Sequence, residues 1–337
     1  MHYRNFHEAY IETLHETYHH PHFFNAPRGN PSREKLNYHL SIKNPVERVC
    51  YLASRKTNIV FNFAEVLWYL SADNSLDFIG YYNKKMPEYS MNGKTLTGTA
   101  YGPKIFEFGN AKVNQRKQIK DLLTYEDVDS KRAFMQIFDA TELVIPKNTD
   151  VSCTLGLQFF VRENKLYTAS FMRANDAFRG IVSDVFSFTF FQELMARELK
   201  LELGEYFHNV GSIHVYQPDN QWTEKVLQEA KSNPPKMKPV FEFPKMPFTD
   251  NWPSIETVLK YESLLRKDQI QMSSLDNGQL HLPEYWKQIL LLFSLYQYIA
   301  NERPIDFSLY TNLLPVYQHF MINKWPSHFK EREKIQY

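Results

Sequence analysis

The most informative segment of the chain reads Asp150-Val151-Ser152-Cys153-Thr154-Leu155-Gly156-Leu157-Gln158-Phe159-Phe160-Val161. Its apolar and β-branched residues predict a strand over residues 150–161, with Cys153 inside it. A free cysteine in a strand is more often an inert core residue than a nucleophile, and Cys50, which lies in an apolar run, keeps that interpretation. A chemical role for Cys153 therefore needs support from other segments.

Two segments further along the chain supply that support. The first is Arg173-Ala174-Asn175-Asp176-Ala177-Phe178-Arg179-Gly180, followed by Ser183-Asp184, and the second is Gly211-Ser212-Ile213-His214-Val215-Tyr216. A cysteine, an arginine–aspartate segment and a His-x-Tyr pair, in this order and spacing, resemble the active site of the thymidylate synthase family. The resemblance covers roughly residues 20–225. It implies the α+β thymidylate synthase fold, a mixed twisted sheet with helices packed on one face.

Composition is compatible with a globular enzyme. The chain has 337 residues, of which 43% are hydrophobic, enough for one large domain with an appendage or two smaller ones. A net charge of +1 gives no indication of nucleic acid as a partner. We find no run of about 20 apolar residues that would predict a membrane span. Two cysteines do not make a disulfide framework, so we expect reduced thiols and a cytoplasmic protein.

Periodicity divides the chain into three parts. Helices are predicted over 6–19, 62–70, 180–199, 255–266, 283–303 and 307–323, and strands over 36–42, 132–139, 150–161, 166–172 and 207–216. We expect a catalytic domain over 1–231, a proline-rich linker over 232–254 and a helical extension over 255–337. The sequence assigns no role to the extension.

Several cations are candidates for a phosphate site. By resemblance, Arg173 binds the nucleotide phosphate close to the catalytic sulfur. Lys131 and Arg132 resemble a basic pair that reaches the same phosphate from a partner subunit, which implies a homodimer with shared active sites. The family usually has arginine in place of Lys131. The family's loop arginine matches Arg28, with Arg33 as the alternative, and several cations converging on a dianion suit phosphate binding.

The resemblance also assigns the groups that act on the pyrimidine ring. Cys153 is implied as the nucleophile, and its thiolate needs nearby cations. Glu65 lies in an apolar helical segment where burial of a charge is costly, and it matches a glutamate that manages protons through ordered water. Tyr101 matches a tyrosine that assists removal of the C5 proton. Gln158 is implied to flank the substrate and Ser187 to support nearby water.

Further candidates concern the sugar and the co-substrate. His214 and Tyr216 alternate on one predicted strand, so both side chains lie on the same face, and the resemblance implies that they bind the sugar hydroxyl. Gly180 is a further substrate-binding candidate. Asp176 matches an aspartate that contacts the folate pterin, and Trp68 is a second folate candidate. Methylenetetrahydrofolate is thereby implied as co-substrate, without a metal ion.

Asp184 indicates which base is bound. Thymidylate synthases carry an asparagine here, whose amide accepts from the uracil N3–H and donates to O4. Cytosine reverses both groups, and a carboxylic acid, or a carboxylate facing a protonated N3, fits the reversed pattern. Deoxycytidylate hydroxymethylases of the family carry aspartate at this position. The alternative is an ordinary exposed acid on the helix predicted over 180–199.

These features favour folate-dependent 5-hydroxymethylation of a cytosine nucleoside monophosphate. Ala174, where the synthases have serine, together with Lys131 favours CMP over dCMP. The charged end of the chain, 328–334, replaces an apolar tail that seals the site in the synthases, so we expect water to attack the exocyclic methylene. A thymidylate synthase acting on dUMP and a non-catalytic relative that binds nucleotides or partners remain as alternatives. The sequence leaves the pathway open, whether phage DNA modification, a nucleoside antibiotic or an antimetabolite.

Overall fold

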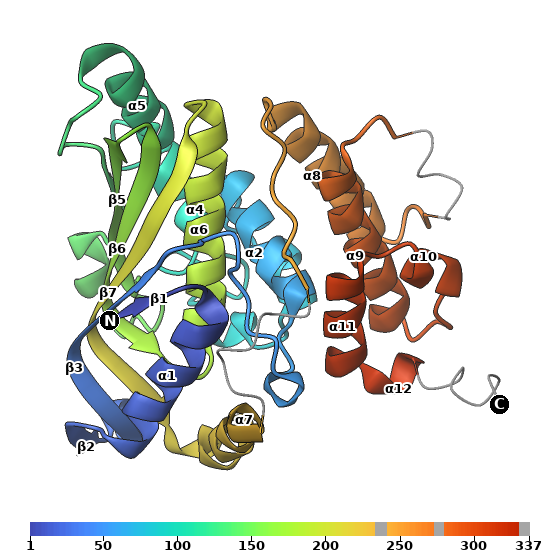
Figure 1. Ribbon diagram of the computed structural model, residues 1–337, viewed down its shortest axis with the longest axis horizontal. Helices are drawn as coiled ribbons and strands as arrows, with labels where there is room; N and C mark the ends of the chain where they lie inside the picture. The colour runs from blue at the N-terminus through green and yellow to red at the C-terminus, as the bar shows by residue number, and fades with distance from the viewer. Residues whose placement is uncertain (233–240, 273–279, 330–337) are drawn as a thin grey trace.

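A seven-stranded mixed sheet forms one layer of the molecule (Figure 1). The computed structural model describes residues 1–232, 241–272 and 280–329. Six strands run in the order β1-β3-β7-β6-β5-β4, while β2 pairs with β3. The pairs β1–β3 and β6–β7 are parallel and the others are antiparallel. The bounds are β1 His2–Tyr3, β2 Phe23–Asn25, β3 Ser32–Ile42, β4 Phe134–Gln136, β5 Thr154–Arg162, β6 Lys165–Asp176 and β7 Glu202–Tyr216.

Helices cover one face of this sheet. The central helix is α6, Gly180–Glu198, which connects the parallel strands β6 and β7, because parallel neighbours need a crossover. Beside it lie α1, Phe6–His19, and α2, Ile59–Leu70. The shorter helices of this part are α3 Leu76–Tyr82, α4 Tyr101–Phe106, α5 Gln115–Asp121 and α7 Asn220–Ser232. The expected α+β fold with a mixed sheet and packed helices is confirmed.

The C-terminal helices form a further layer, which packs against α2 (Figure 1). They are α8 Trp252–Arg266, α9 Glu284–Ala300, α10 Phe307–Thr311, α11 Pro315–Lys324 and α12 Pro326–Phe329. Phe63 of α2 meets Tyr317 of α11 with ring centroids 6.0 Å apart. Every residue of α2 except Phe61 is buried, and a helix buried on all sides is expected to be mostly apolar, as this one is. One continuous hydrophobic core therefore joins the sheet, α2 and the C-terminal helices.

Of the linker predicted over 232–254, residues 233–240 lie outside the described residues, Ser232 ends α7, and α8 begins at Trp252. The segment 241–251 packs on the core through the buried Phe243 and Met246. Met246 donates from its backbone N–H to Glu193 Oε1 at 2.8 Å, and Arg197 Nε donates to the Met246 carbonyl at 3.2 Å. Glu193 is itself buried in an ion pair with Arg48. These contacts attach the segment to the C-terminal part of α6.

Most element boundaries differ from the predictions by one to five residues, and three differences change the interpretation of an element. The strand predicted over 150–161 begins at Thr154, so Cys153 precedes β5 and does not lie inside a strand. The strand predicted over 132–139 is only β4, Phe134–Gln136. The helix predicted over 307–323 is two helices, since the chain turns after Thr311 and α11 restarts with Pro315 at its first position. In the part of the chain that the structure describes, no helix is long and apolar enough to cross a bilayer.

Candidate active site

Cys153 and Arg173 form the centre of the candidate site. The Arg173 side chain lies along the segment before β5, where Nε donates to the Ser152 carbonyl at 2.8 Å and Nη2 to the Val151 carbonyl at 2.9 Å. Its Nη2 is 3.7 Å from Cys153 Sγ. A guanidinium has five N–H donors, so these contacts leave donors for an anion next to the sulfur.

Burial keeps the Cys153 thiol protonated in the unliganded protein. Burial raises the pKa of Cys153 above its usual value, and Arg173 opposes that rise; Asp184 adds to it and Arg28 opposes it. The cations expected to favour the thiolate are thus outweighed by loss of solvent. A base must remove the thiol proton before the sulfur can act as a nucleophile.

Glu65 faces the site from α2. Burial raises the pKa of Glu65 to about 8, and the nearby Asp184 adds to the rise. Ser187 of α6 donates from Oγ to Glu65 Oε2 at 3.2 Å, and Tyr69, one turn along α2, donates a second hydrogen bond. A carboxyl group that is neutral near pH 7 can both donate and accept a proton, as acid–base catalysis requires.

Tyr101 stands between Glu65 and the cysteine segment. Thr154, the residue after Cys153, donates from Oγ1 to the Tyr101 hydroxyl oxygen at 3.0 Å. The Tyr101 ring stacks on Tyr69 with centroids 4.9 Å apart and planes at 18°. Burial raises the pKa of Tyr101 well above its usual value, so the hydroxyl remains a hydrogen-bond donor.

Asp184 and Asn175 make a buried polar pair. Asn175 Nδ2 donates to Asp184 Oδ2 at 2.8 Å, while Asn175 Oδ1 is buried and has no protein partner among the described residues. Burial raises the pKa of Asp184 to about 7, although the hydrogen bond from Asn175 opposes the rise. An exposed position for Asp184 is excluded, and the carboxyl group is poised between two protonation states at neutral pH.

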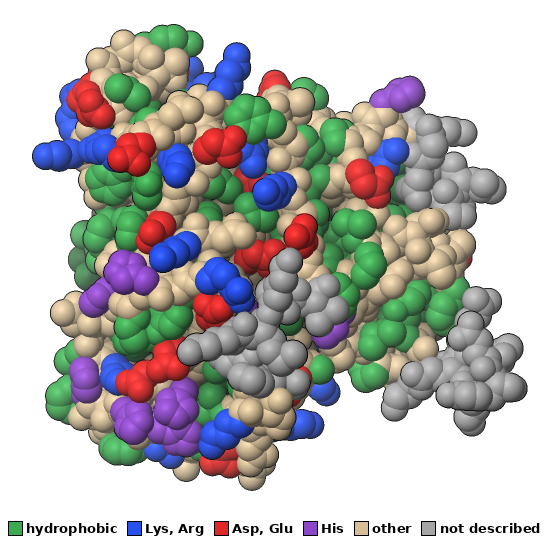
Figure 2. All heavy atoms as spheres, viewed as in Figure 1, with side chains coloured by type: hydrophobic (Ala, Val, Ile, Leu, Met, Phe, Trp, Pro, Cys, Tyr) green, Lys and Arg blue, Asp and Glu red, His purple; other side chains and the backbone are tan. Residues whose placement is uncertain are grey.

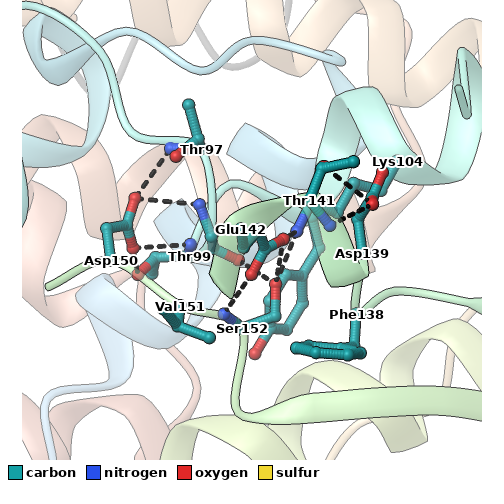
Figure 3. A network of polar contacts seen from close by, with 12 residues as sticks. Thr97, Thr99, Lys104, Phe138, Asp139, Thr141, Glu142, Asp150, Val151 and Ser152 are labelled. Atoms are coloured by element: carbon teal, nitrogen blue, oxygen red, sulfur yellow. Dashed lines mark hydrogen bonds and ion pairs between the residues drawn. The ribbon is translucent and has the colours of Figure 1, made fainter. Parts of the chain in front are cut away.

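A polar network ties the loop before Tyr101 to the segment before Cys153 (Figure 3). The Asp150 carboxylate accepts from the backbone N–H groups of Thr97, Gly98 and Thr99 at 2.7, 2.9 and 2.8 Å. Ser152 donates from its N–H to Glu142 Oε2 at 2.7 Å and from Oγ to the Gly98 carbonyl at 2.7 Å. Lys104 pairs with Glu142. The network fixes Tyr101 and Cys153 relative to each other.

Strands β6 and β7 contribute three further side chains to the cluster, those of Asp176, His214 and Tyr216. His214 and Tyr216 of β7 have ring centroids 4.7 Å apart, and His214 pairs across the sheet with Asp176 of β6. Asp176 Oδ1 accepts from the N–H groups of Phe178 and Arg179 at 2.8 and 2.9 Å. Burial raises the pKa of Asp176 and lowers that of His214. The imidazole is therefore neutral near pH 7.

Of the two loop arginines, Arg28 is the one that faces the cluster. It adopts the left-handed conformation, with φ of 53°, and hydrogen-bonds to Tyr216. Arg33 instead stacks over the Tyr18 ring at 4.4 Å and donates from Nη1 to the Tyr18 carbonyl at 3.3 Å. Arg28 therefore contacts the cluster through Tyr216, whereas Arg33 contacts Tyr18.

The chain is similar in sequence to known proteins. The family model described as "Thymidylate synthase" matches residues 8–256. The chain belongs to the thymidylate synthase family. It is 27% identical over 311 residues to the "Deoxyuridylate hydroxymethyltransferase" of Bacillus phage SP01, covering 82% of this chain and 79% of the phage protein. A second protein of that name, from Delftia phage PhiW-14, is 29% identical over 208 residues, covering 58% and 56% of the two chains. The "Thymidylate synthase" of Mycoplasma genitalium is 23% identical over 236 residues, covering 61% and 80%.

Some residues predicted from the resemblance to the thymidylate synthase family lie outside the cluster in this structure. Trp68 is fully buried on α2, a helix on which every residue except Phe61 is buried. Gln158 donates from Nε2 to the Lys131 carbonyl at 2.8 Å. Its strand neighbours Leu157 and Phe159 are buried, so Gln158 lies on the sheet face opposite the helices. Arg132 is exposed and lies 3.9 Å from Glu126, outside the cluster of its own chain.

Two candidates occupy backbone positions beside the site. Ala174 lies on β6 opposite Ser212 of β7. Gly180 begins α6, and a Cβ at this glycine would lie 3.4 Å from Asp184 Oδ2 and 3.6 Å from Asn175 Oδ1. Gly180 therefore leaves space beside the Asn175–Asp184 pair.

Sequence reasoning missed Asn175, Tyr69 and Asp150. Asn175 lies between two singled-out residues, Ala174 and Asp176, but its bond to Asp184 spans nine positions and depends on how α6 follows β6. Tyr69 could have been found, because it lies one helical turn after Glu65. The Asp150 contacts join segments about 50 residues apart, and no sequence pattern links them.

Proposed function

We propose that the chain is a folate-dependent hydroxymethylase that acts on C5 of a cytosine nucleoside monophosphate. The observation that carries the proposal is Asp184, a buried carboxyl group at the base-reading position, with a pKa of about 7 and a hydrogen bond from Asn175. It lies in one cluster with Cys153, Glu65 and Tyr101. Buried polar groups select a ligand strongly, because a mismatched partner leaves them unsatisfied.

In this proposal Arg173 and Arg28 hold the nucleotide phosphate, and Lys131 and Arg132 reach it from a second copy of the chain. His214 and Tyr216 bind the sugar, and Asp176 contacts the folate. Gly180 and Ala174 leave room beside the nucleotide, and Ala174 favours CMP over dCMP. The expected dimer also accounts for the position of Arg132, which is exposed and outside the cluster of its own chain.

The proton of a neutral Asp184 allows its carboxyl group to form two hydrogen bonds with the base. As a neutral acid, Asp184 donates its O–H to cytosine N3, and its carbonyl oxygen accepts from the N4 amino group. The bond from Asn175 Nδ2 to Asp184 Oδ2 holds the plane of the carboxyl group. The unpartnered Asn175 Oδ1 can accept a further hydrogen bond from the ligand or from water.

Chemistry begins when the Cys153 thiol loses its proton and the sulfur adds to C6, which makes C5 nucleophilic. Methylenetetrahydrofolate, when bound, supplies the one-carbon unit to C5. Tyr101 and Glu65, linked through Tyr69, assist removal of the C5 proton, and tetrahydrofolate leaves as the C5–H electron pair forms the exocyclic double bond. Glu65 and Ser187 then place the water whose oxygen adds to the exocyclic carbon, while Cys153 leaves C6 and the ring regains its double bond. The product is the 5-hydroxymethyl nucleotide.

A second candidate is hydroxymethylation of dUMP. The two phage relatives carry the name "Deoxyuridylate hydroxymethyltransferase". A neutral Asp184 also suits uracil, because its O–H can donate to O4 while its carbonyl oxygen accepts from N3–H. Thymidylate synthesis from dUMP is less favoured, since it requires exclusion of water from the methylene. The expectation that water reaches the methylene rests on the charged segment 328–334, and residues 330–337 lie outside the described residues. A non-catalytic role would leave the assembled cluster unexplained.

One assay separates these functions. The protein is incubated with methylenetetrahydrofolate and, separately, CMP, dCMP, UMP and dUMP, and products are identified by mass. We expect addition of CH2O to a cytosine nucleotide with release of tetrahydrofolate. Conversion of uracil nucleotides alone would establish the second candidate, and a methyl product with dihydrofolate would establish a synthase. Cys153→Ser is the control: it should abolish turnover and keep nucleotide binding within about tenfold. Failure of all four nucleotides to exchange a C5 tritium with solvent would refute an enzyme of this type.

A further inference from the structure

Three histidines gather at the C-terminal end of α1, away from the candidate active site. His15 and His19 are one helical turn apart, and His20 is the residue that ends the helix. Their ring centroids are separated by 4.8 Å for His15 and His19, 5.6 Å for His15 and His20, and 6.5 Å for His19 and His20. Figure 2 shows histidine side chains clustered on the surface over this end of α1.

We propose that His15, His19 and His20 bind a divalent transition-metal ion such as Zn²⁺. With Zn–N distances of about 2.0–2.1 Å and tetrahedral angles, the centroids of two coordinated rings lie about 5 Å apart. The separations of His15 from His19 and from His20, 4.8 and 5.6 Å, are close to that value, and the 6.5 Å between His19 and His20 shortens when these two side chains rotate toward His15. Donor atoms of His15, His20 and Glu16 already lie within 4.8 Å of one another. Imidazole is a common ligand of zinc, copper and nickel.

The surroundings favour a metal ion. Burial lowers the pKa of His19, and the nearby His15, Lys231, His20 and Arg33 lower it further, so its ring is unprotonated at neutral pH and free to coordinate. The last carbonyl groups of α1 place the negative end of the helix dipole beside the three rings. Lys231 and Arg33 repel a cation, whereas Glu16 attracts one. Glu16 and the end of the helix dipole oppose the repulsion from these two cations.

Glu16 makes the site structural and not hydrolytic. His15-Glu16-Thr17-Tyr18-His19 has the H-E-x-x-H spacing that places two zinc ligands on one helix face and, in metalloproteases, a glutamate as general base. Here Glu16 Oε2 accepts from Lys35 Nζ of β3 at 2.7 Å, and this bond holds the pKa of Glu16 below its usual range. The other oxygen, Oε1, is 3.9 Å from His15 Nδ1 and can orient that ring or act as a fourth ligand.

A metal ion would fasten the start of the segment that carries Arg28. His20 is followed by β2 and then by the turn at Pro27–Gly29, where Arg28 lies. Coordination of His20 to two residues of α1 fixes the point at which this segment leaves the helix. The consequence is a gain in stability when the ion binds the folded chain alone.

The test is a calorimetric titration of Zn²⁺ into untagged protein freed of metal with a chelator. We expect one ion per chain, with affinity falling from pH 7.5 to pH 5.5 as the imidazoles become protonated. His15→Ala/His19→Ala should weaken binding at least tenfold, and so should His20→Ala, whose exposed side chain makes a folding defect improbable. His281→Ala, at an exposed histidine elsewhere, is the matched control. Titrations in the Cys153→Ser background remove the thiol as a competing ligand.

Circular dichroism of the metal-free variants provides the folding control. No binding by the wild-type chain, or equal affinity in the wild type and in both histidine variants, would overturn the proposal. Zn²⁺ should also raise the melting temperature of the wild type and of His281→Ala, and leave that of the double variant unchanged. A rise of equal size in the double variant would overturn it as well.

Discussion

Asp184→Asn is the substitution that best tests how the base is read. The amide keeps the shape of the side chain and removes its titration. The acid can carry its proton on either oxygen, whereas the amide has one fixed donor and one fixed acceptor, and its oxygen must face Asn175 Nδ2. In the order that suits uracil, with an acceptor for N3–H and a donor for O4, the amide presents the wrong group to both N3 and N4 of cytosine. Each unsatisfied group costs about 1–3 kcal/mol, so two groups lower kcat/KM for cytosine nucleotides on the order of 30-fold to 10⁴-fold.

The same substitution should change the pH dependence of stability. Burial raises the pKa of Asp184 from 3.8 to about 7, so the folded chain holds this proton more tightly than the unfolded chain. A group of this kind stabilises the fold fully below the unfolded pKa, and the stabilisation is lost as pH rises through the folded pKa. From pH 5 to pH 8 the titration of Asp184 alone lowers the free energy of unfolding of the wild type by about 2–3 kcal/mol. The asparagine variant should lack that loss, while Glu65 continues to titrate in both proteins.

The assays are kcat/KM for CMP, dCMP, UMP and dUMP at several pH values and urea unfolding at pH 5 and pH 8. Protein concentration is held constant, because association changes apparent stability. Asn175→Leu is the companion variant: it removes the bond to Asp184 Oδ2 and should raise the apparent pKa of Asp184 further. An unchanged cytosine-to-uracil ratio in Asp184→Asn, together with the wild-type loss of stability between pH 5 and pH 8, would refute the reasoning.

Three further predictions follow from the site. Glu65→Gln should lower kcat at least 100-fold and remove the limb of the pH–rate profile near pH 8; a profile that keeps this limb would exclude Glu65 as its source. Gly98→Ala should lower kcat by about 100-fold with little change in nucleotide binding, because the new Cβ would lie 1.9 Å from the Asp150 carbonyl oxygen. Gly80→Ala, where the nearest atom is 4.0 Å away, should leave kcat unchanged. Equal activities of the two variants would contradict a role for the polar network around Asp150 in positioning Tyr101 and Cys153. Refolding a one-to-one mixture of inactive Cys153→Ala and Arg132→Ala chains should restore about a quarter of wild-type activity if sites are shared, since about half the dimers are mixed and each has one intact site. Cys153→Ala mixed with Arg173→Ala should restore none, and failure of the first mixture, with mixed dimers verified by native mass spectrometry, would place Arg132 outside the site.

Elements with strong local signals could be predicted from the sequence. The helix over 6–19 has the predicted bounds, because Asn5 caps it by accepting from the Glu8 N–H and its apolar residues repeat every three to four positions. The position of Cys153 could not be predicted. The backbone before β5 is held by Arg173 and by Ser152, whose partners lie far along the chain.

Candidate site residues could be named from the sequence where a proposed role depends on residue type and order, and not where it depends on surroundings. Order alone marked Cys153, Arg173, Asp184 and His214. The protonation of Cys153 and the full burial of Trp68 both follow from packing of the whole chain. Roles for Lys131 and Arg132 depend on a second copy, which one sequence does not display.

The place of β7 in the sheet has a consequence for synthesis on the ribosome. Among the described residues β7 is the last strand to be made, yet it lies between β3 and β6, and Ser32 of β3 pairs with Tyr216 of β7. At a synthesis rate of about 5–20 residues per second, β3 waits on the order of 10 s or longer for β7 to be made. During that time its backbone edge is open to other chains. Nascent chains stalled before residue 216 should therefore need chaperones, and the nucleotide site can form only when the end of β7 has left the exit tunnel.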